Sequence, residues 1–418
     1  MRPRTMNRMP KESLVSRRTL LKVCAGTWWL SAPVLRAWAS EARPSQPLIA
    51  AKIILEHDDG QFLWFHPRAC AILGPDPAKP PRILMTIQKH LRVSDYYSGL
   101  WYMTSEDLGE TWRGPMEIPS LAWREGPGNS TESVADFTPG YHFRTRKVLA
   151  MGAGVYYAPD GSQIEDLPIA SPTVYAVFDP EHDAWSERAI LRLPDEPRFH
   201  TSRCACSQWL VLEDGSLLIP LYFKSREQQD YSVAVARCAF DGSSITFQDL
   251  GNAMTATGGR GLCEPSLARC RNRFFLTLRN DNRGYVTTSD DGLRFEPIQP
   301  WLFDDGTELG SYNTQQHWLT HGDRLFLAYT RRGAGNDHVP RHRAPLFLAE
   351  VDPDRLVVMR DTEQVLVPER GATLGNFGAT PVTPEESWVT VSEGVWSDDA
   401  RRRGATGATW IARVRWQS

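Results

Sequence analysis

The residues Ser105-Glu106-Asp107-Leu108-Gly109-Glu110-Thr111-Trp112 place Ser, Asp, Gly, Thr and Trp at the spacing of one β-hairpin turn. In such a turn the Asp107 carboxylate binds the loop backbone, Gly109 supplies a positive φ, and Trp112 packs beneath the loop. Degenerate versions of the same turn begin at three later positions: Val177-Phe178-Asp179, Phe240-Asp241-Gly242 and Thr288-Ser289-Asp290-Asp291-Gly292. Their aromatic ends are about fifty to seventy residues apart, the length of one four-stranded sheet. The sequence therefore predicts a repeated antiparallel β unit.

We expect an all-β fold, a six-bladed β-propeller of four-stranded antiparallel blades, with a seventh blade in residues 113–173 as the alternative. The fourth blade is expected to end with an outer strand at Phe295–Ile298. The last unit has only three predicted strands, and Leu48–Leu55 is expected to add the fourth, which closes the ring and removes exposed sheet edges. The predicted inner strands are Phe65–Leu73, Ser133–Phe137, Ser207–Leu212, Pro265–Arg269, Gln315–Thr320 and Ala379–Thr383.

The N-terminus predicts export. Ser16-Arg17-Arg18-Thr19-Leu20-Leu21-Lys22 resembles a twin-arginine signal, and Ala37-Trp38-Ala39 is a small-x-small cleavage site. The apolar Val23–Leu35 between them is too short and interrupted to span a membrane. Residues 1–39 are therefore interpreted as a signal peptide and residues 40–418 as the propeller domain of a periplasmic or secreted protein.

Composition limits the partners. The 418 residues include 15 Trp, 31 Gly and 30 Pro, and the net charge of −3 argues against nucleic-acid binding through bulk electrostatics. We expect a monomer. Six cysteines follow the signal, which allows disulfides in an oxidising compartment, although buried thiols are favoured. No metal-ligand spacing stands out, so no cofactor is expected; a structural calcium ion is conceivable but not indicated.

Polar residues at the ends of the inner strands are expected to converge on one channel-mouth site. His66, in Trp64-Phe65-His66-Pro67-Arg68, is the central candidate, because histidine is the residue type suited to proton transfer near neutral pH. The other candidates for catalysis are Asp95, Tyr96, Tyr97, His200 and His338. The candidates for substrate binding are Arg68, Gln88, Arg203, Glu264, Arg279, Asn280, Gln315, Arg331, Arg332 and Asn376.

The Ser105–Trp112 turn is the Asp-box, and with the strand at Phe65 it makes the chain resemble the sialidase superfamily of β-propellers. In that family three arginines clamp the substrate carboxylate, a Tyr–Glu pair is the nucleophile and an Asp is the acid/base. The resemblance implies these roles for Glu264 (the glutamate), Arg279 (the second arginine), Arg331 or Arg332 (the third) and Asp95 (the acid/base). Two positions depart from it: His66 replaces the first arginine, and Asn376-Phe377-Gly378 offers no tyrosine.

The site is more similar to sialidase-like propellers that act on uronate polysaccharides, namely ulvan lyases and rhamnosyl–glucuronate-cleaving enzymes. In those relatives histidine and tyrosine transfer protons and arginine binds the uronate. β-Elimination requires a cation at the carboxylate, a base and an acid. We therefore expect an enzyme that cleaves an oligo- or polysaccharide containing acidic sugars. An exo-α-sialidase or other glycosidase, and a non-catalytic glycan-binding propeller, remain the alternatives.

Overall fold

The computed structural model describes residues 45–74, 76, 79–164 and 170–417. The predicted signal peptide, its cleavage site and Cys24 lie outside the described residues. The residues from Ser45 onward belong to one unit built from six antiparallel sheets, which confirms the six-bladed fold. The alternative of a seventh blade is wrong, because residues 131–157 form the two longest strands of blade two.

The strands follow one another from the inner to the outer edge of each blade. Blade one contains β2 (Leu63–Ile72), β3 (Arg82–His90), β4 (Tyr97–Ser105) and β5 (Arg113–Glu117). Blade two contains β6 (Arg124–Glu125), β7 (Thr131–His142), β8 (Lys147–Tyr157), β9 (Thr173–Asp179), β10 (Ala184–Trp185) and β11 (Ala189–Ile190). Blade three contains β12 (Thr201–Arg203), β13 (Leu210–Val211), β14 (Leu217–Lys224), β15 (Ser232–Phe240) and β16 (Ile245–Leu250).

Blades four to six repeat the pattern. Blade four contains β17 (Cys263–Cys270), β18 (Arg273–Arg279), β19 (Tyr285–Ser289) and β20 (Gln299–Pro300). Blade five contains β21 (His317–His321), β22 (Arg324–Tyr329), β23 (Leu346–Asp352), β24 (Val357–Val358) and β25 (Gln364–Val367). Blade six contains β26 (Phe377–Thr383), β27 (Glu386–Ser392), β28 (Ala408–Arg415) and β1 (Leu48–Glu56), and the short helix α1 (Asp398–Arg402) lies between β27 and β28.

The outer strand predicted at Phe295–Ile298 is wrong. The Phe295 N–H donates to the Asn252 side chain and its carbonyl accepts from the same side chain, at 2.7 and 3.0 Å. Both backbone groups of Phe295 are therefore used outside the sheet, and the outer strand β20 forms at Gln299–Pro300 instead.

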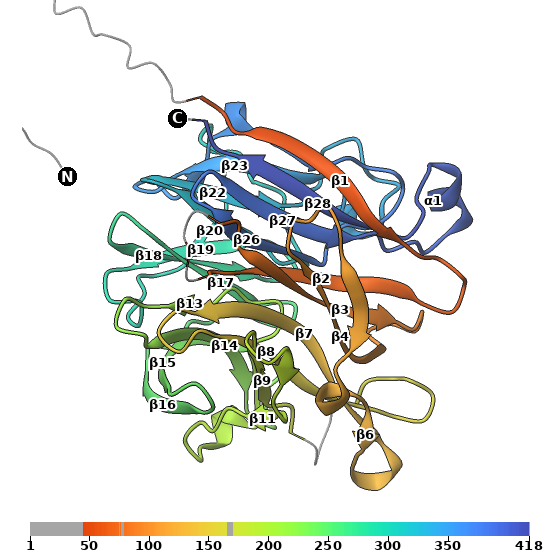
Figure 1. Cartoon of the computed structure of the whole chain (residues 1–418). Helices are drawn as coiled ribbons and strands as arrows, with labels where there is room; N and C mark the ends of the chain where they lie inside the picture. Colours follow the sequence, from red (N-terminus) through yellow and green to blue (C-terminus); the bar gives the residue numbers. More distant parts are fainter. Residues whose placement is uncertain (1–44, 75, 77–78, 165–169, 418) are drawn as a thin grey trace, which may run out of the picture. The chain divides into compact units, whose positions relative to one another are not determined.

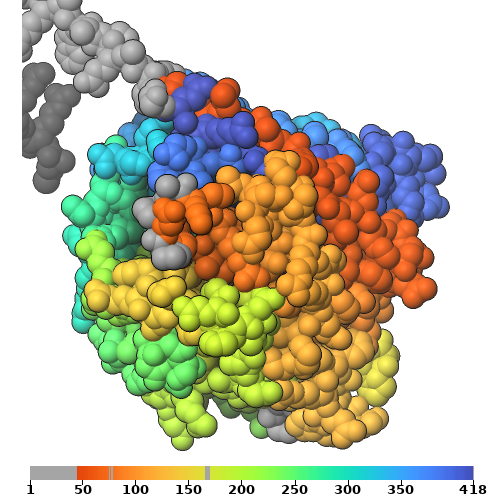
Figure 2. All heavy atoms as spheres, viewed as in Figure 1, coloured from red at the N-terminus to blue at the C-terminus, as the bar shows by residue number. Residues whose placement is uncertain are grey.

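The two ends of the described chain share one sheet. β1 pairs antiparallel with β28, from Leu48 opposite Arg415 to Glu56 opposite Ala408. Figure 1 shows the red-orange β1 along the blue β28, and in Figure 2 atoms of these two colours are in direct contact. The predicted ring closure by Leu48–Leu55 is confirmed. Because β1 and β28 pair with each other, both terminal strands of the described chain are part of one sheet.

The Asp-box turn has the predicted geometry. The Asp107 carboxylate accepts from the Thr111 N–H at 2.9 Å and from the Thr111 hydroxyl at 2.6 Å, which lowers the pKa of Asp107 to about 2. Gly109 has φ +76°, and the Trp112 indole donates to its carbonyl at 3.2 Å. The turn thus connects β4 to β5, the two outer strands of blade one, and Trp388 of blade six lies against it.

The six cysteines in the described chain are buried free thiols, so the disulfides left open by the sequence do not form: Cys70, Cys204, Cys206, Cys238, Cys263 and Cys270. Burial raises the pKa of Cys70 and Cys204 to about 12. Within the described ranges, no helix is long and apolar enough to cross a membrane.

Candidate functional site

The inner strands share an unusual backbone feature at one end. His66, Asp136, Cys206, Glu264 and Asn313 have φ values of 54°, 59°, 55°, 45° and 47°. Positive φ is uncommon for residues with a Cβ and tends to occur where the surrounding structure enforces it, often at functional sites. β-Bulges accompany it in β2, β7 and β17, between Phe65 and Arg68, Ala135 and Thr138, and Cys263 and Ser266. A bulge redirects a side chain, and here each redirected side chain lines the same cavity.

This axial cavity has a volume of about 300 Å³. Its wall holds the carboxylates of Asp95, Asp136, Glu264 and Asp281, and the guanidinium groups of Arg203, Arg260, Arg279, Arg341 and Arg343. With one more cation than anion before His66 is counted, the wall favours a ligand that carries a negative charge. Four tyrosines also line it: Tyr97, Tyr157, Tyr222 and Tyr231.

His66 and Asp136 form a buried pair. The Nε2 of His66 lies 2.7 Å from Oδ1 of Asp136, and the His66 side chain is only 2% exposed. Burial alone would raise the pKa of Asp136, but the hydrogen-bonded His66 and the nearby Arg68 hold it well below its usual value. Nδ1 of His66 is buried without a hydrogen-bond partner in the described structure, and Nε2 is the ring nitrogen that faces the ionised Asp136 carboxylate. The pair therefore places a group able to carry a proton beside a fixed negative charge in the cavity wall.

Glu264 and Arg279 form the second buried pair. Arg279 donates to the Glu264 carboxylate and, at 2.5 Å, to the side-chain oxygen of Asn313. Burial opposes both charges, but their mutual attraction outweighs it, so the pKa of Glu264 is lowered and that of Arg279 is raised. Arg260 binds both oxygens of Asp281 at 3.2 Å beside this pair. These two arginines are therefore already neutralised by protein carboxylates.

Arg343 differs from them. It donates to the backbone carbonyl of Asn313, its Nε has no partner, and it forms no ion pair with any described residue. Burial, with the Arg279 charge nearby, lowers the pKa of Arg343 to about 10, so the guanidinium remains charged at neutral pH. A buried, uncompensated cation on the cavity wall is suited to an incoming carboxylate.

Tyr97 lies beside the histidine. The two ring centroids are 4.6 Å apart, and the Tyr97 hydroxyl is 3.4 Å from Oδ1 of Asp95. Burial and the charges of Asp95 and Asp136 raise the pKa of Tyr97 well above its usual value. Its hydroxyl therefore keeps its proton and can donate it.

The structure brings seven of the predicted site residues to this cavity: His66, Asp95, Tyr97, Arg203, Glu264, Arg279 and Asn376. Arg68, predicted to bind substrate, is buried outside this cavity, because the bulge between Phe65 and Arg68 breaks the strand alternation that would place it on the same face as His66. There it donates to the Phe377 carbonyl at 2.5 Å and to Gln315 at 3.4 Å. Gln315 donates to the same carbonyl, and neither residue lines the axial cavity.

The remaining predicted residues lie outside the cavity wall. Gln88 and Asn280 are buried braces whose amides bind backbone carbonyls. The Tyr96 ring stacks on Trp123, and His338 pairs with Glu369 at 3.1 Å. Arg331 binds Glu363 with two nitrogens, Arg332 covers the Tyr312 ring, and His200 lines a separate hollow beside Leu191–Pro197.

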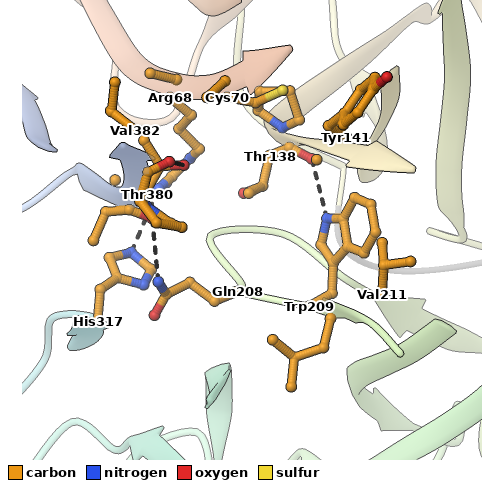
Figure 3. Close-up of a pocket in the computed structure, with 18 of the residues that line it drawn as sticks. Arg68, Cys70, Thr138, Tyr141, Gln208, Trp209, Val211, His317, Thr380 and Val382 are labelled. Atoms are coloured by element: carbon orange, nitrogen blue, oxygen red, sulfur yellow. Dashed lines mark hydrogen bonds between the residues drawn. The ribbon is translucent and has the colours of Figure 1, made fainter. Parts of the chain in front are cut away.

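A larger cavity of about 590 Å³ opens at the opposite ends of the inner strands, and Arg68 lies on its wall. Figure 3 shows Arg68, Gln208 and His317 on one side of it and Tyr141, Trp209 and Val211 on the other. Burial and the Arg68 charge hold the pKa of His317 well below its usual value, so this ring is neutral. Arg68 is bound to the Phe377 carbonyl, and the rest of this wall is mainly apolar. The smaller axial cavity, with its paired acids and bases, is therefore the candidate active site.

Sequence reasoning missed Asp136, Cys206, Tyr157 and Tyr222 as site residues. Asp136 could have been found, because it is a charged residue inside the predicted inner strand Ser133–Phe137. Tyr157 and Tyr222 come from second strands, and their approach to the cavity has no local signal. The third arginine was expected at Arg331 or Arg332, but the residue in the cavity is Arg343, because Arg331 is held by Glu363.

Comparison with solved structures supports the architecture. A protein of unknown function from Dyadobacter fermentans DSM 18053 superposes with a TM-score of 0.58 at 15% identity, over 90% of this chain and 99% of that one. Trypanosoma rangeli sialidase, in complex with the inhibitor DANA, superposes with a TM-score of 0.57 at 11% identity, over 88% and 60%. The fold is the sialidase propeller.

The NanB sialidase from Streptococcus pneumoniae gives a TM-score of 0.58 at 11% identity, over 87% of this chain and 70% of that one. The chain spans about 60% of the length of the Trypanosoma sialidase described above. No family model matches the sequence, and no curated protein matches it. At these identities the comparisons show a shared fold, and any inference about the chemistry depends on the arrangement of side chains in the cavity.

Proposed function

We propose that this protein is an exported carbohydrate-active enzyme that cleaves a glycosidic bond beside an acidic sugar. The observation that carries the proposal is the combination, in one cavity, of a histidine paired with an ionised carboxylate and a buried arginine that has no ion pair within the described chain. The sialidase fold is compatible with a carbohydrate ligand. The carboxylate of an acidic sugar would give Arg343 the ion-pair partner that it does not have among the described residues.

The proposed reaction is β-elimination at a uronate. Arg343 binds the carboxylate, which makes the neighbouring C5 proton more acidic. The His66 imidazole, positioned by Asp136, takes that proton, the C4–O bond breaks, and a C4–C5 double bond forms. The Tyr97 hydroxyl donates its proton to the departing oxygen. The C5 proton thus goes to His66 and the departing oxygen takes a proton from Tyr97. The electron pair of the C5–H bond becomes the new double bond, and that of the C4–O bond leaves with the oxygen.

The test uses purified protein with a panel of uronate polysaccharides and a fluorogenic sialoside. We expect new C4–C5 unsaturation, read by ultraviolet absorbance, and unsaturated products by mass spectrometry. Sialoside turnover without unsaturation would replace elimination by hydrolysis. Binding without turnover of any substrate would make the protein a glycan-binding propeller.

Two variants connect the activity to the site. His66→Gln should abolish turnover, whereas His182→Gln, a change in an exposed histidine paired with Asp179, should leave turnover unchanged. Arg343→Met should raise KM roughly 10- to 100-fold, since a charge-assisted hydrogen bond contributes about 1.5–3 kcal/mol. Arg402→Met, which changes an exposed arginine, is its control. Full activity in His66→Gln would overturn the proposed function.

A further inference from the structure

A second hollow adjoins the axial cavity. It also has a volume of about 300 Å³. Its wall includes residues that line the axial cavity as well: Asp95, Tyr97, Arg341, Arg343 and Asn376. A ligand that reaches from one hollow to the other would therefore pass the Tyr97 hydroxyl and the Arg343 guanidinium.

The outer wall of this hollow is aromatic. Trp396 lies between β27 and α1, is 43% exposed, and packs against His90 and Phe65 with centroid distances of 4.9 and 5.7 Å. Its indole N–H donates to the Thr373 hydroxyl at 3.0 Å, which fixes the ring plane. An exposed aromatic ring that is already held in place loses little conformational entropy when it binds a ligand.

The same wall carries little free charge. Burial, together with the charges of His66 and Arg92, lowers the pKa of His90 to about 3, so the imidazole is neutral at ordinary pH. Arg92 binds Asp58 at 3.1 Å and the Val395 carbonyl at 3.3 Å, so its charge is compensated. This wall therefore differs from that of the axial cavity, which collects nine charged side chains.

We infer that the second hollow binds an uncharged sugar ring stacked on Trp396, next to the acidic sugar in the axial cavity. The apolar C–H face of a pyranose fits a fixed indole, and the ring hydroxyls can reach Arg341 and Asn376 at the junction. The substrate is then at least a disaccharide in which an acidic residue is linked to a neutral one. This inference rests on the proposed function for the identity of the first sugar.

The kinetic test compares Trp396→Ala with Phe143→Ala, which changes an exposed aromatic residue at the opposite ends of the inner strands. The substrates are the shortest oligosaccharide that the wild type cleaves and the 4-O-methyl derivative of its acidic sugar, in which methanol replaces the sugar as the group that leaves from C4. Trp396→Ala should lower kcat/KM for the oligosaccharide roughly 10- to 100-fold, the effect of about 1.4–2.8 kcal/mol, and change that for the 4-O-methyl derivative less than about twofold. Trp396→Phe should restore most of the loss.

An equal loss on both substrates, or an equal effect of Phe143→Ala, would overturn the inference while leaving the His66 result intact. A binding measurement covers the case in which His66→Gln keeps full activity and the proposed function fails. Saturation-transfer NMR with lactose, cellobiose and methyl α-rhamnoside should show transfer to at least one of these probes in the wild type, lost in Trp396→Ala and kept in Phe143→Ala. No transfer to any of the three probes would also overturn the inference.

Discussion

Nε2 of His66 lies 2.7 Å from Oδ1 of Asp136, and the two residues come from the inner strands of adjacent blades. Arg68 lies 3.8 Å from the same carboxylate oxygen. One carboxylate thus orients the imidazole above it and compensates the guanidinium below it. The predictions start from this relationship.

Asp136→Asn should lower kcat about 100- to 10,000-fold with a smaller change in KM, because the amide no longer fixes the proton on Nε2. The variant should also lose about 1–3 kcal/mol of stability, since Arg68 loses a compensating charge. Steady-state kinetics and urea unfolding measure the two effects. The exposed Asp249→Asn should change neither, and wild-type kcat in Asp136→Asn would remove this pair from the mechanism.

Glu264→Gln should destabilise the fold by about 3 kcal/mol, because Arg279 would remain charged and buried without its main partner. Glu213→Gln is the matched control, since Glu213 is 89% exposed in its pair with Arg269 and should contribute less than about 1 kcal/mol. Urea unfolding gives both values. Equal losses would show that burial of the pair does not decide its contribution.

The pH dependence of stability should respond to Asp291. Burial tends to raise its pKa, but the N–H groups of Arg294 and Leu293 and the Ser289 hydroxyl lower it from 3.8 to about 2. Because the folded pKa is the lower one, this stability is fully present above ~pH 4 and is lost as pH falls toward 2. Asp291→Asn should lower the Tm at pH 7 and flatten its decline between pH 4 and 2. The exposed neighbour variant Asp290→Asn should keep the wild-type slope.

Gly109→Ala should cost more than Gly60→Ala. Both glycines have positive φ, +76° and +82°, so an alanine is strained at either position by about 1–2 kcal/mol. Only at Gly109 would the new Cβ also meet the Trp388 ring, at 2.8 Å, which should add about 1–3 kcal/mol. Chemical denaturation of the two variants isolates the contact, and equal losses would mean that the Asp-box turn can shift away from blade six.

Deleting residues 45–56 should abolish cooperative unfolding or lower the Tm strongly, because β28 would become an exposed edge that can pair with other chains. Thermal unfolding and size-exclusion chromatography would show both effects. A chain beginning at Ser45 serves as the control. A monomeric, equally stable deletion variant would show that β1 is dispensable.

The strands could be predicted because each is an apolar run between turn signals; the strand predicted at Leu48–Leu55 is observed at Leu48–Glu56. The site could be predicted only where a residue follows directly from its strand, as for His66, Glu264 and Arg279. A β-bulge changes the face of a side chain without a local sequence signature, and this separated Arg68 from His66. Arg343 replaced Arg331 because a distant carboxylate, Glu363, holds Arg331, and sequence spacing contains no such information.

Blade six combines β1 and β28, which are translated first and last within the described chain. A nascent chain can therefore assemble blades one to five while it is still on the ribosome, but the ring cannot close until residues 408–415 have emerged. Until then β1 lacks its only strand partner and is a ready target for a chaperone. Ring closure is thus the last step in assembling the six blades, and it fixes the mutual position of blades one and six on which the His66 site depends.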